Sequence, residues 1–262
     1  MRKPGAARLR LALYQILLLL AVFVLWHVLT ATQVLPPFFF GRPLLVLERV
    51  LDWFVSGTIY RHLWVTLLET VLAFAAGTVL GLGVGLWLGL SPLASSLLDP
   101  YIKAANAMPR VILAPIFAVW FGLGIWSKVA LGVTLVFFIV FFNVYQGVKE
   151  VSPSILANAR MLGMSERQLM RHVYWPSALS WMFSSLHTSV GFAVVGAVVG
   201  EYLGSAAGLG YIIQQAEGIF DVAGVFAGMI VLAAFVIAID TLVTLAEKRL
   251  LVWRPAVTEA RV

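Results

Sequence analysis

Long apolar runs alternate with short polar stretches along this sequence, and each long run can cross a membrane. A hydrocarbon core of about 30 Å needs about 20 predominantly apolar residues in helical form. The predicted spanning helices are residues 11–29, 63–90, 99–122, 129–148, 178–200 and 222–245. The pattern therefore predicts an all-α, polytopic membrane protein with about six transmembrane helices.

The first run follows four basic residues, as the apolar part of a secretory signal peptide does. It is long enough to span, and no small-residue cleavage site follows it, so a spanning helix is favoured. After it, apolar positions from Leu44 to Phe54 recur at helical spacing, with Glu48, Arg49 and Asp52 opposite. That pattern is typical of an interfacial amphipathic helix, and a tightly packed loop is the alternative.

The second run carries a glycine at every fourth position, at Gly77, Gly81, Gly85 and Gly89. One helix face is therefore smooth and lets another backbone approach closely, which is a main source of helix association in lipid. We expect this face to pack against another helix, and a pore-lining role is the alternative.

The third run contains Pro109, Arg110 and Pro115, which are unusual in a lipid-facing helix. Proline frees carbonyl groups that neighbours must satisfy, and a charge inside a span needs a cavity or a partner. We therefore expect a kinked helix at the centre of the bundle.

The fifth run has one face of small polar residues, next to His187, and this face consists of Ser177, Ser180, Ser184, Thr188 and Gly191. Such a face can line a path for a polar solute or form hydrogen bonds between helices, and both interpretations stay open. Residues 201–221 are polar and rich in glycine, which suggests a re-entrant loop lining a cavity on the outer side. The predicted translocation path is Arg110, Ser180, Ser184, His187, Thr188 and Glu201.

Between the fourth and fifth runs, residues 156–181 carry too many charges to lie in hydrocarbon. A helical apolar spacing continues through Leu156, Ala159 and Leu162, and Gly163 interrupts it. We expect two short water-exposed helices that meet at a bend, with Pro176 opening the next apolar run. An ordinary amphipathic loop is the alternative.

Composition agrees with a membrane protein and excludes several functions. The chain is 61% hydrophobic and 11% charged with a mean hydropathy of +0.97, whereas soluble domains carry roughly 25% charged residues. Because there is no cysteine, neither a disulfide nor a thiolate site is expected. The sequence has no glycine-rich phosphate-binding loop and no hydrolase motif, so we expect no enzyme activity, no cofactor and no metal.

Basic residues indicate the orientation. Six spans place both termini and the polar stretch on one side, which then holds twelve Lys and Arg residues against four on the other. The positive-inside rule makes that side cytoplasmic. Because these charges flank the membrane, nucleic acid is not an expected partner.

The spacing after Gly163 matches a known motif. Nine residues separate Gly163 from Val173, and Tyr174 and Trp175-Pro176 follow. This arrangement resembles the coupling loop, or EAA motif, of ABC importer permeases. The matching positions are Ala159, Gly163 and Pro176, and the departures are Ala157 for Glu, Asn158 for Ala and Trp175 for Leu.

Other motifs are similar to permeases of the nitrate, sulfonate, taurine and bicarbonate type. They are Met108-Pro109-Arg110, Ala114-Pro115, Trp120-Phe121-Gly122 and Gly208-Leu209-Gly210-Tyr211. The resemblance implies a type I ABC importer permease-like fold with a cytoplasmic coupling-helix loop, in the bacterial cytoplasmic (inner) membrane with both termini cytoplasmic. The residues implied in ATPase coupling are Ala157, Asn158, Ala159, Arg160, Gly163, Met164, Ser165 and Pro176.

The same resemblance implies the partners. They are two copies of an ATP-binding ABC ATPase subunit that hydrolyses the ATP, a periplasmic or lipid-anchored solute-binding protein, a second permease copy in a homodimer, and membrane lipid. The expected solute is a small anion such as an aliphatic sulfonate, taurine or nitrate, which Arg110 near a cavity would suit. The alternative is a stand-alone secondary transporter or channel, with Arg110, Glu201 and Asp240 as its ion relay.

The expected organisation follows from these assignments. Residues 1–10 form a cytoplasmic N-terminus, and 11–62 hold the first transmembrane helix and a periplasmic amphipathic segment. Residues 63–250 form a five-helix permease core with a cytoplasmic coupling loop at 149–176, and 251–262 form a cytoplasmic tail.

Overall fold

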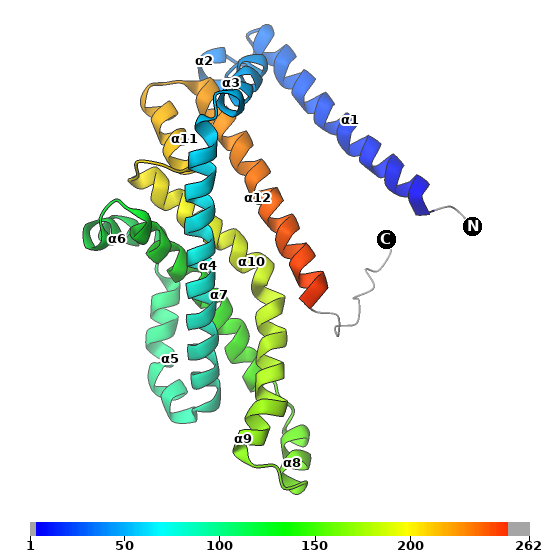
Figure 1. Ribbon diagram of the computed structural model, residues 1–262, viewed down its shortest axis with the longest axis vertical. Helices are drawn as coiled ribbons and strands as arrows, with labels where there is room; N and C mark the ends of the chain where they lie inside the picture. The colour runs from blue at the N-terminus through cyan, green and yellow to red at the C-terminus, as the bar shows by residue number, and fades with distance from the viewer. Residues whose placement is uncertain (1–3, 251–262) are drawn as a thin grey trace. The chain divides into compact units, whose positions relative to one another are not determined.

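The computed structural model describes residues 4–250, which form helices joined by short turns, with no strand in that range (Figure 1). The predicted tail at 251–262 and the first three residues lie outside the described residues. The elements are α1 (Pro4–Ala31), α2 (Pro37–Phe40), α3 (Pro43–Val55), α4 (Thr58–Leu90), α5 (Pro92–Ala107), a 3₁₀ turn (Arg110–Leu113), α6 (Ala114–Phe121), α7 (Ile125–Lys149), α8 (Pro153–Met161), α9 (Glu166–Leu169), a π-helical turn (Met170–Tyr174), α10 (Trp175–Leu203), α11 (Leu209–Gly218) and α12 (Val222–Leu250).

Among residues 4–250, five helical stretches are long and apolar enough to cross a membrane. They are Leu13–Ala31, Thr58–Leu90, Ile125–Lys149, Glu166–Leu203 and Val222–Leu245. The number becomes six if α5 and the segment Arg110–Phe121 count as one span, bent by 87°. The all-α fold with about six spans is therefore confirmed.

The bent span begins earlier than the predicted start at residue 99. Pro92 occupies the first turn of α5, and the Ser91 hydroxyl accepts a hydrogen bond from the Ala94 N–H at 3.3 Å, which caps the helix. Pro100 lies inside α5 without ending it. The break comes at Pro109, because proline disfavours helical geometry in the residue before it and donates no backbone hydrogen bond.

Contacts divide the chain into two compact units, one of Met1–Tyr60 with Ile212–Leu232 and one of Arg61–Tyr211 with Ala233–Val262. In the first unit the predicted amphipathic stretch is indeed helical, as α3. Its Val46 is fully buried, and its Arg49 forms an ion pair with Asp221 at 3.1 Å. The Trp26 indole donates a hydrogen bond to the Phe40 carbonyl at 3.1 Å.

In the second unit, the glycine stripe of α4 packs against a ridge of valines on α7. A Cβ atom added to any of these glycines would lie only 2.7–2.9 Å from the Cβ of the facing valine, which is too close for a real contact. The pairs are Gly77–Val136, Gly81–Val140, Gly85–Val144 and Gly89–Val148. The predicted helix-packing role is confirmed, and the stripe does not line a pore because α7 covers it.

Helix α7 also packs closely against α10. A Cβ on Gly196 of α10 would lie 2.8 Å from the backbone nitrogen of Gly132 of α7, and a Cβ on Gly147 would lie 2.5 Å from the Trp181 ring. Buried Ala178, Met182 and Ala193 share a core with the valine ridge. α7 is therefore the central helix of this unit, between α4 and α10.

Candidate functional site

The polar segment, residues 149–176, is built around a turn that its own residues hold in place. α8 ends in a Schellman motif, in which the Met164 N–H bonds the Ala159 carbonyl at 3.1 Å and the Gly163 N–H bonds the Arg160 carbonyl at 2.9 Å. Gly163 has φ +78°, a left-handed conformation that favours glycine. The predicted bend at Gly163 is confirmed.

The next helix begins with a capping box. The Ser165 hydroxyl accepts a hydrogen bond from the Gln168 N–H at 3.4 Å, and the Gln168 side chain accepts one from the Ser165 N–H at 2.8 Å. The backbone hydrogen bonds at both ends of the turn are thus formed by residues of the polar segment itself.

Of the two predicted short helices, the second is present as α9, and Pro176 lies in the first turn of α10 as predicted, but α9 does not end before α10 begins. α9 continues through the π-helical turn into α10, and Glu166–Leu203 forms one long helical stretch. In the π-helical turn the Trp175 N–H bonds the Met170 carbonyl, five residues back. This shifted hydrogen bonding directly precedes Pro176, which donates none, so the helix passes the proline without ending.

Not every apolar residue of the polar segment is buried. Ala159 and Leu169 are buried, but Met161 and Leu162 are 86% and 81% exposed at the tip of the turn. Leu162 continues the spacing of Leu156 and Ala159, yet it caps the end of α8 and points away from the unit's core. The sequence reasoning did not single out these two residues as functional, although apolar residues beside a predicted water-exposed bend were a usable signal.

The polar face of α10 is mostly uncovered in this chain. Ser180, Ser184 and Thr188 are exposed, and a Cβ added to Gly191 would meet no atom of the described residues within 4 Å. His187 Nδ1 lies 3.1 Å from Asp240 Oδ1 of α12. Ser177, at the start of this face, donates to the Gly147 carbonyl of α7 at 2.7 Å, so hydrogen bonding between helices is confirmed at Ser177 and His187, and a solute path along the three exposed side chains stays a prediction.

Arg110 lies at the bend of the broken span. Its guanidinium donates to the Asn106 carbonyl at 3.2 Å and to the Asn106 side chain, and it stacks over the Phe138 ring at 4.6 Å. These partners offset the cost of its charge, as the sequence led us to expect. Arg110 is not among the residues lining the cavity nearest the bend.

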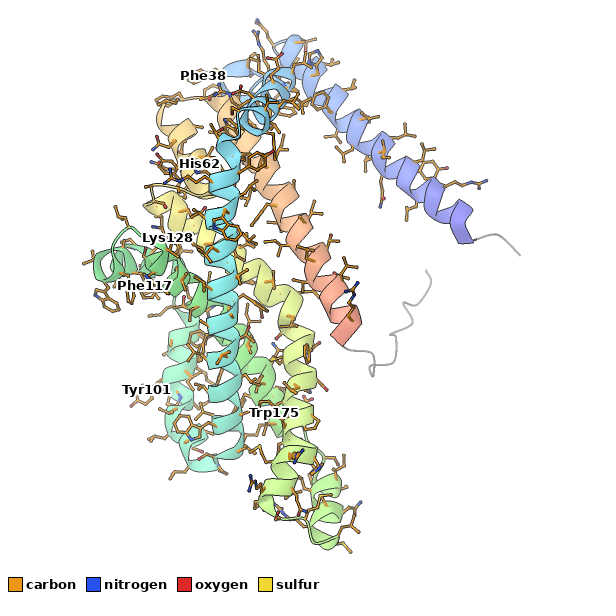
Figure 2. The ribbon with its side chains drawn as sticks, viewed as in Figure 1. Phe38, His62, Tyr101, Phe117, Lys128 and Trp175 are labelled. Atoms are coloured by element: carbon orange, nitrogen blue, oxygen red, sulfur yellow. The ribbon has the colours of Figure 1, made fainter. Side chains whose placement is uncertain are left out.

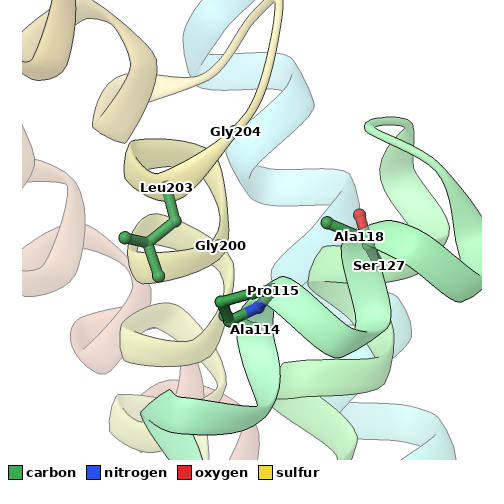
Figure 3. Close-up of a pocket in the computed structure, with 7 residues that line it drawn as sticks. All are labelled: Ala114, Pro115, Ala118, Ser127, Gly200, Leu203 and Gly204. Atoms are coloured by element: carbon green, nitrogen blue, oxygen red, sulfur yellow. The ribbon is translucent and has the colours of Figure 1, made fainter.

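That cavity has a volume of about 230 Å³ and lies where the bend meets the end of α10 (Figure 3). Its lining residues are Ala114, Pro115, Ala118, Ser127, Gly200, Leu203 and Gly204. All are uncharged, and the Ser127 hydroxyl already donates to the Gly124 carbonyl at 3.0 Å. The cavity is suited to a small uncharged or weakly polar group more than to a tightly bound anion.

The predicted re-entrant loop at 201–221 is replaced by the end of α10, a short connection and the helix α11. Glu201 is only 1% exposed, in contrast to the open path for which the sequence proposed it. It lies in a buried polar cluster with Thr66 and Glu69 of α4 and Lys128 of α7. Figure 2 marks Lys128 and, on α4, His62.

The predicted path residues consequently do not form one site. Glu201 belongs to the buried cluster, His187 pairs with Asp240, and Arg110 is held by Asn106. The ion relay of the alternative hypothesis needs Arg110, Glu201 and Asp240 together, and the structure assigns them to three separate networks.

Comparison with known proteins gives a consistent picture. The family model described as "Binding-protein-dependent transport system inner membrane component" matches residues 77–252. SsuC of Bacillus subtilis, whose description names aliphatic sulfonates transport, is 32% identical over 97% of this chain and 91% of its own length. ThiX of Halalkalibacterium halodurans, a formylaminopyrimidine transport permease protein, is 33% identical over 93% of this chain and 96% of its own length. TauC of Escherichia coli, a taurine transport system permease protein, is 29% identical over 96% of this chain and 92% of its own length.

A solved structure has the same fold. A chain of the inward-facing MetNI methionine ABC transporter matches with a TM-score of 0.62 and 21% identity, covering 73% of this chain and 94% of that chain.

Proposed function

This chain belongs to the family of binding-protein-dependent transport system inner membrane components and is the permease subunit of an ABC importer, and we propose that its polar segment receives the movement of a separate ATPase subunit. The observation that carries the proposal is the exposed turn between α8 and α9. Its geometry is fixed by its own hydrogen bonds, and apolar Met161 and Leu162 project from it. Exposed apolar side chains on a rigid, polar-rimmed element favour a protein partner.

The continuous helix from Glu166 to Leu203 explains how movement would reach the membrane. A displacement of the turn is applied at one end of this helix, and α10 packs along α7, which packs along α4. Close packing transmits such displacements as rigid-body motion. Ala157, Asn158, Ala159, Arg160, Gly163, Met164 and Ser165 form the docking element in this proposal, and Pro176 lies in the lever that follows it.

The other partners follow from the family. The importer would contain two permease copies as a homodimer, two ATPase subunits and a periplasmic or lipid-anchored solute-binding protein. The distribution of Lys and Arg supports an inner-membrane orientation with both termini and the polar segment in the cytoplasm. Residues 63–250 would then be the permease core, and the exposed face of α10, with Ser180, Ser184 and Thr188 beside His187, would border the solute path.

For the solute we propose a small organic anion, an aliphatic sulfonate or taurine, with nitrate as a smaller anion of the same charge. SsuC and TauC support this choice. ThiX and the riboflavin transport system permease protein RibX of Chloroflexus aurantiacus are relatives of similar identity with other solutes in their names. No charged side chain lines the cavity beside the bend, so in this proposal the choice of the anion rests with the binding protein and not with this cavity.

The test is Gly163→Leu in the transporter reconstituted with its ATPase and binding protein. Leucine is strained at φ +78°, so the turn should change shape while the spans still insert. We expect ATP hydrolysis to continue without solute uptake. Gly83→Leu is the matched control, because a Cβ there meets no atom of the described residues within 4 Å and the helix has ordinary geometry. Normal uptake by Gly163→Leu would contradict the proposal, and solute flux by the purified permease alone would favour a stand-alone transporter.

A further inference from the structure

Helix α11 begins without a capping residue of its own. The first N–H groups of a helix have no partner within it, and Ser, Thr, Asp or Asn normally supplies one from the preceding position. Here Gly208 precedes Leu209, the first residue of α11, and glycine has no side chain to offer.

Three side chains from other helices bind the first three N–H groups instead. The Gly208 N–H donates to His62 Nδ1 at 3.1 Å, and the Leu209 N–H donates to Thr66 Oγ1 at 2.9 Å. The Gly210 N–H donates to Glu201 Oε2 at 2.7 Å. Consecutive donors at the start of α11 are thus bound by consecutive turns of α4 and by the end of α10.

Both glycines are needed for this close approach. Gly208 has φ +117°, and a Cβ there would lie against the Glu201 carboxylate. A Cβ on Gly210 would lie 2.9 Å from the Cβ of Glu201. The Gly208-Leu209-Gly210 motif therefore fits against the side chain that binds it.

The Glu201 carboxylate is itself held in place. Thr66 Oγ1 donates to its Oε1 at 2.6 Å, so Thr66 contacts both the carboxylate and the Leu209 N–H. Lys128, only 1% exposed, is close enough to interact with Glu201 electrostatically, and it donates to the Leu123 carbonyl at 2.5 Å. The positive end of the α11 dipole also favours a carboxylate at this position.

We propose that His62, Thr66 and Glu201 are positioning residues that supply, from α4 and α10, the N-cap that α11 lacks. They fix residues 204–210, and Gly204 of this segment lines the cavity beside the bend. Glu201 thereby acts on the loop and does not touch the solute. The effect of the cap on uptake rests on the proposed function, whereas the cap itself rests on the hydrogen bonds alone.

A nitroxide label at Ala206→Cys reports on the loop, because Ala206 is exposed and the chain has no natural cysteine. The full chain is labelled in lipid vesicles, and the mobility of the label is measured in several backgrounds. Thr66→Val removes the hydroxyl and keeps the shape, and Thr66→Ser keeps the hydroxyl. Thr70→Val is the matched control, because Thr70 is 2% exposed on the same helix and its hydroxyl has no hydrogen-bond partner among residues 4–250.

We expect Thr66→Val to shift the label from an immobile to a mobile spectrum, and Thr66→Ser and Thr70→Val to leave it immobile. Glu201→Gln retains one carbonyl oxygen for two donors and should give an intermediate spectrum. This variant also tests the cap if Thr66→Val fails to insert into the membrane. An immobile label in both Thr66→Val and Glu201→Gln, or equal mobility in Thr70→Val, would overturn the proposal.

Uptake by the reconstituted transporter separates this proposal from the proposed function. Thr66→Val should lower the maximal uptake rate and leave the half-saturating solute concentration unchanged, since the cap does not contact solute. A changed half-saturating concentration in Glu201→Gln would place the carboxylate on the solute path and overturn the positioning role. If the parent protein with its ATPase shows no uptake, the proposed function fails, and the label spectra still decide the cap.

Discussion

The N-termini of α9 and α11, the helices before and after α10 in the sequence, are capped in opposite ways. α9 is capped by Ser165, which directly precedes it, and by Gln168 within it. α11 is capped by His62, Thr66 and Glu201, of which the first two are more than 140 residues away from their partners. The N-terminus of α9 is exposed, and its own residues bind its N–H groups. The N-terminus of α11 is buried, and its N–H groups are bound only when the other helices of the bundle are in place.

This difference separates a moving part from a fixed part. A locally capped turn keeps its shape when the surroundings change, so it can dock on a partner and be displaced as a unit. A start capped by other helices keeps its shape only while α4, α7 and α10 stay together. Substitutions in the bundle should therefore lower stability more than substitutions in the exposed turn.

Lys128→Met should give the largest loss of stability. It removes a buried positive charge near the Glu69 and Glu201 carboxyl groups and leaves the Leu123 carbonyl without its donor, and removing such a partner from buried polar and charged groups costs about 3 kcal/mol. Thermal unfolding in detergent measures the change. Lys103→Met is the control, because its ion pair with Asp99 at 2.7 Å is exposed and contributes little. Equal effects of the two substitutions would show that the buried cluster does not hold the bundle.

Gly81→Ala should have a smaller effect on the same bundle. The new Cβ would lie 2.8 Å from the Cβ of Val140, and overpacking of a tight contact costs about 1–3 kcal/mol. Gly83→Ala, two residues along α4, has no neighbour within 4 Å among the described residues and should cost nothing. Unfolding midpoints of both variants measure the difference, and equal midpoints would contradict the packing of α4 on α7.

Ser165→Ala should have the smallest effect on stability. Loss of an N-cap costs about 1 kcal/mol, and here that cost is confined to an exposed helix start. We expect faster hydrogen exchange at residues 166–168 and less uptake per ATP hydrolysed, with the unfolding midpoint nearly unchanged. Ser154→Ala, also exposed in the polar segment, is the control. A large drop in the midpoint would mean that the turn is part of the bundle core.

The sequence predicted what depends on local pattern. The length of the apolar runs predicted the membrane spans. The four-residue spacing of Gly77 to Gly89 predicted a packed helix face, and Gly163 predicted the bend. Each of these signals comes from residues within one element, where the spacing alone determines which side chains share a face.

The features that depend on distant partners were not predicted. Glu201 was expected on an open path because nothing near it in the sequence reveals Thr66 or the α11 donors. The continuity of α9 with α10 through Pro176 was not predicted, because no local sequence pattern marks the π-helical turn that accommodates the proline. The pairing of His187 with Asp240 joins residues of two spans and was likewise not seen.

The most direct test of the account is a cross-link from the tip of the polar segment to the ATPase subunit. Leu162→Cys, in a chain without natural cysteine, carries a short thiol-linked photo-cross-linker in a reconstituted transporter that takes up solute. Gly83→Cys carries the same reagent on the open face of α4. We expect Leu162→Cys to link to the ATPase subunit and Gly83→Cys not to link to it. A working transporter in which Leu162→Cys links to no other polypeptide would contradict the account.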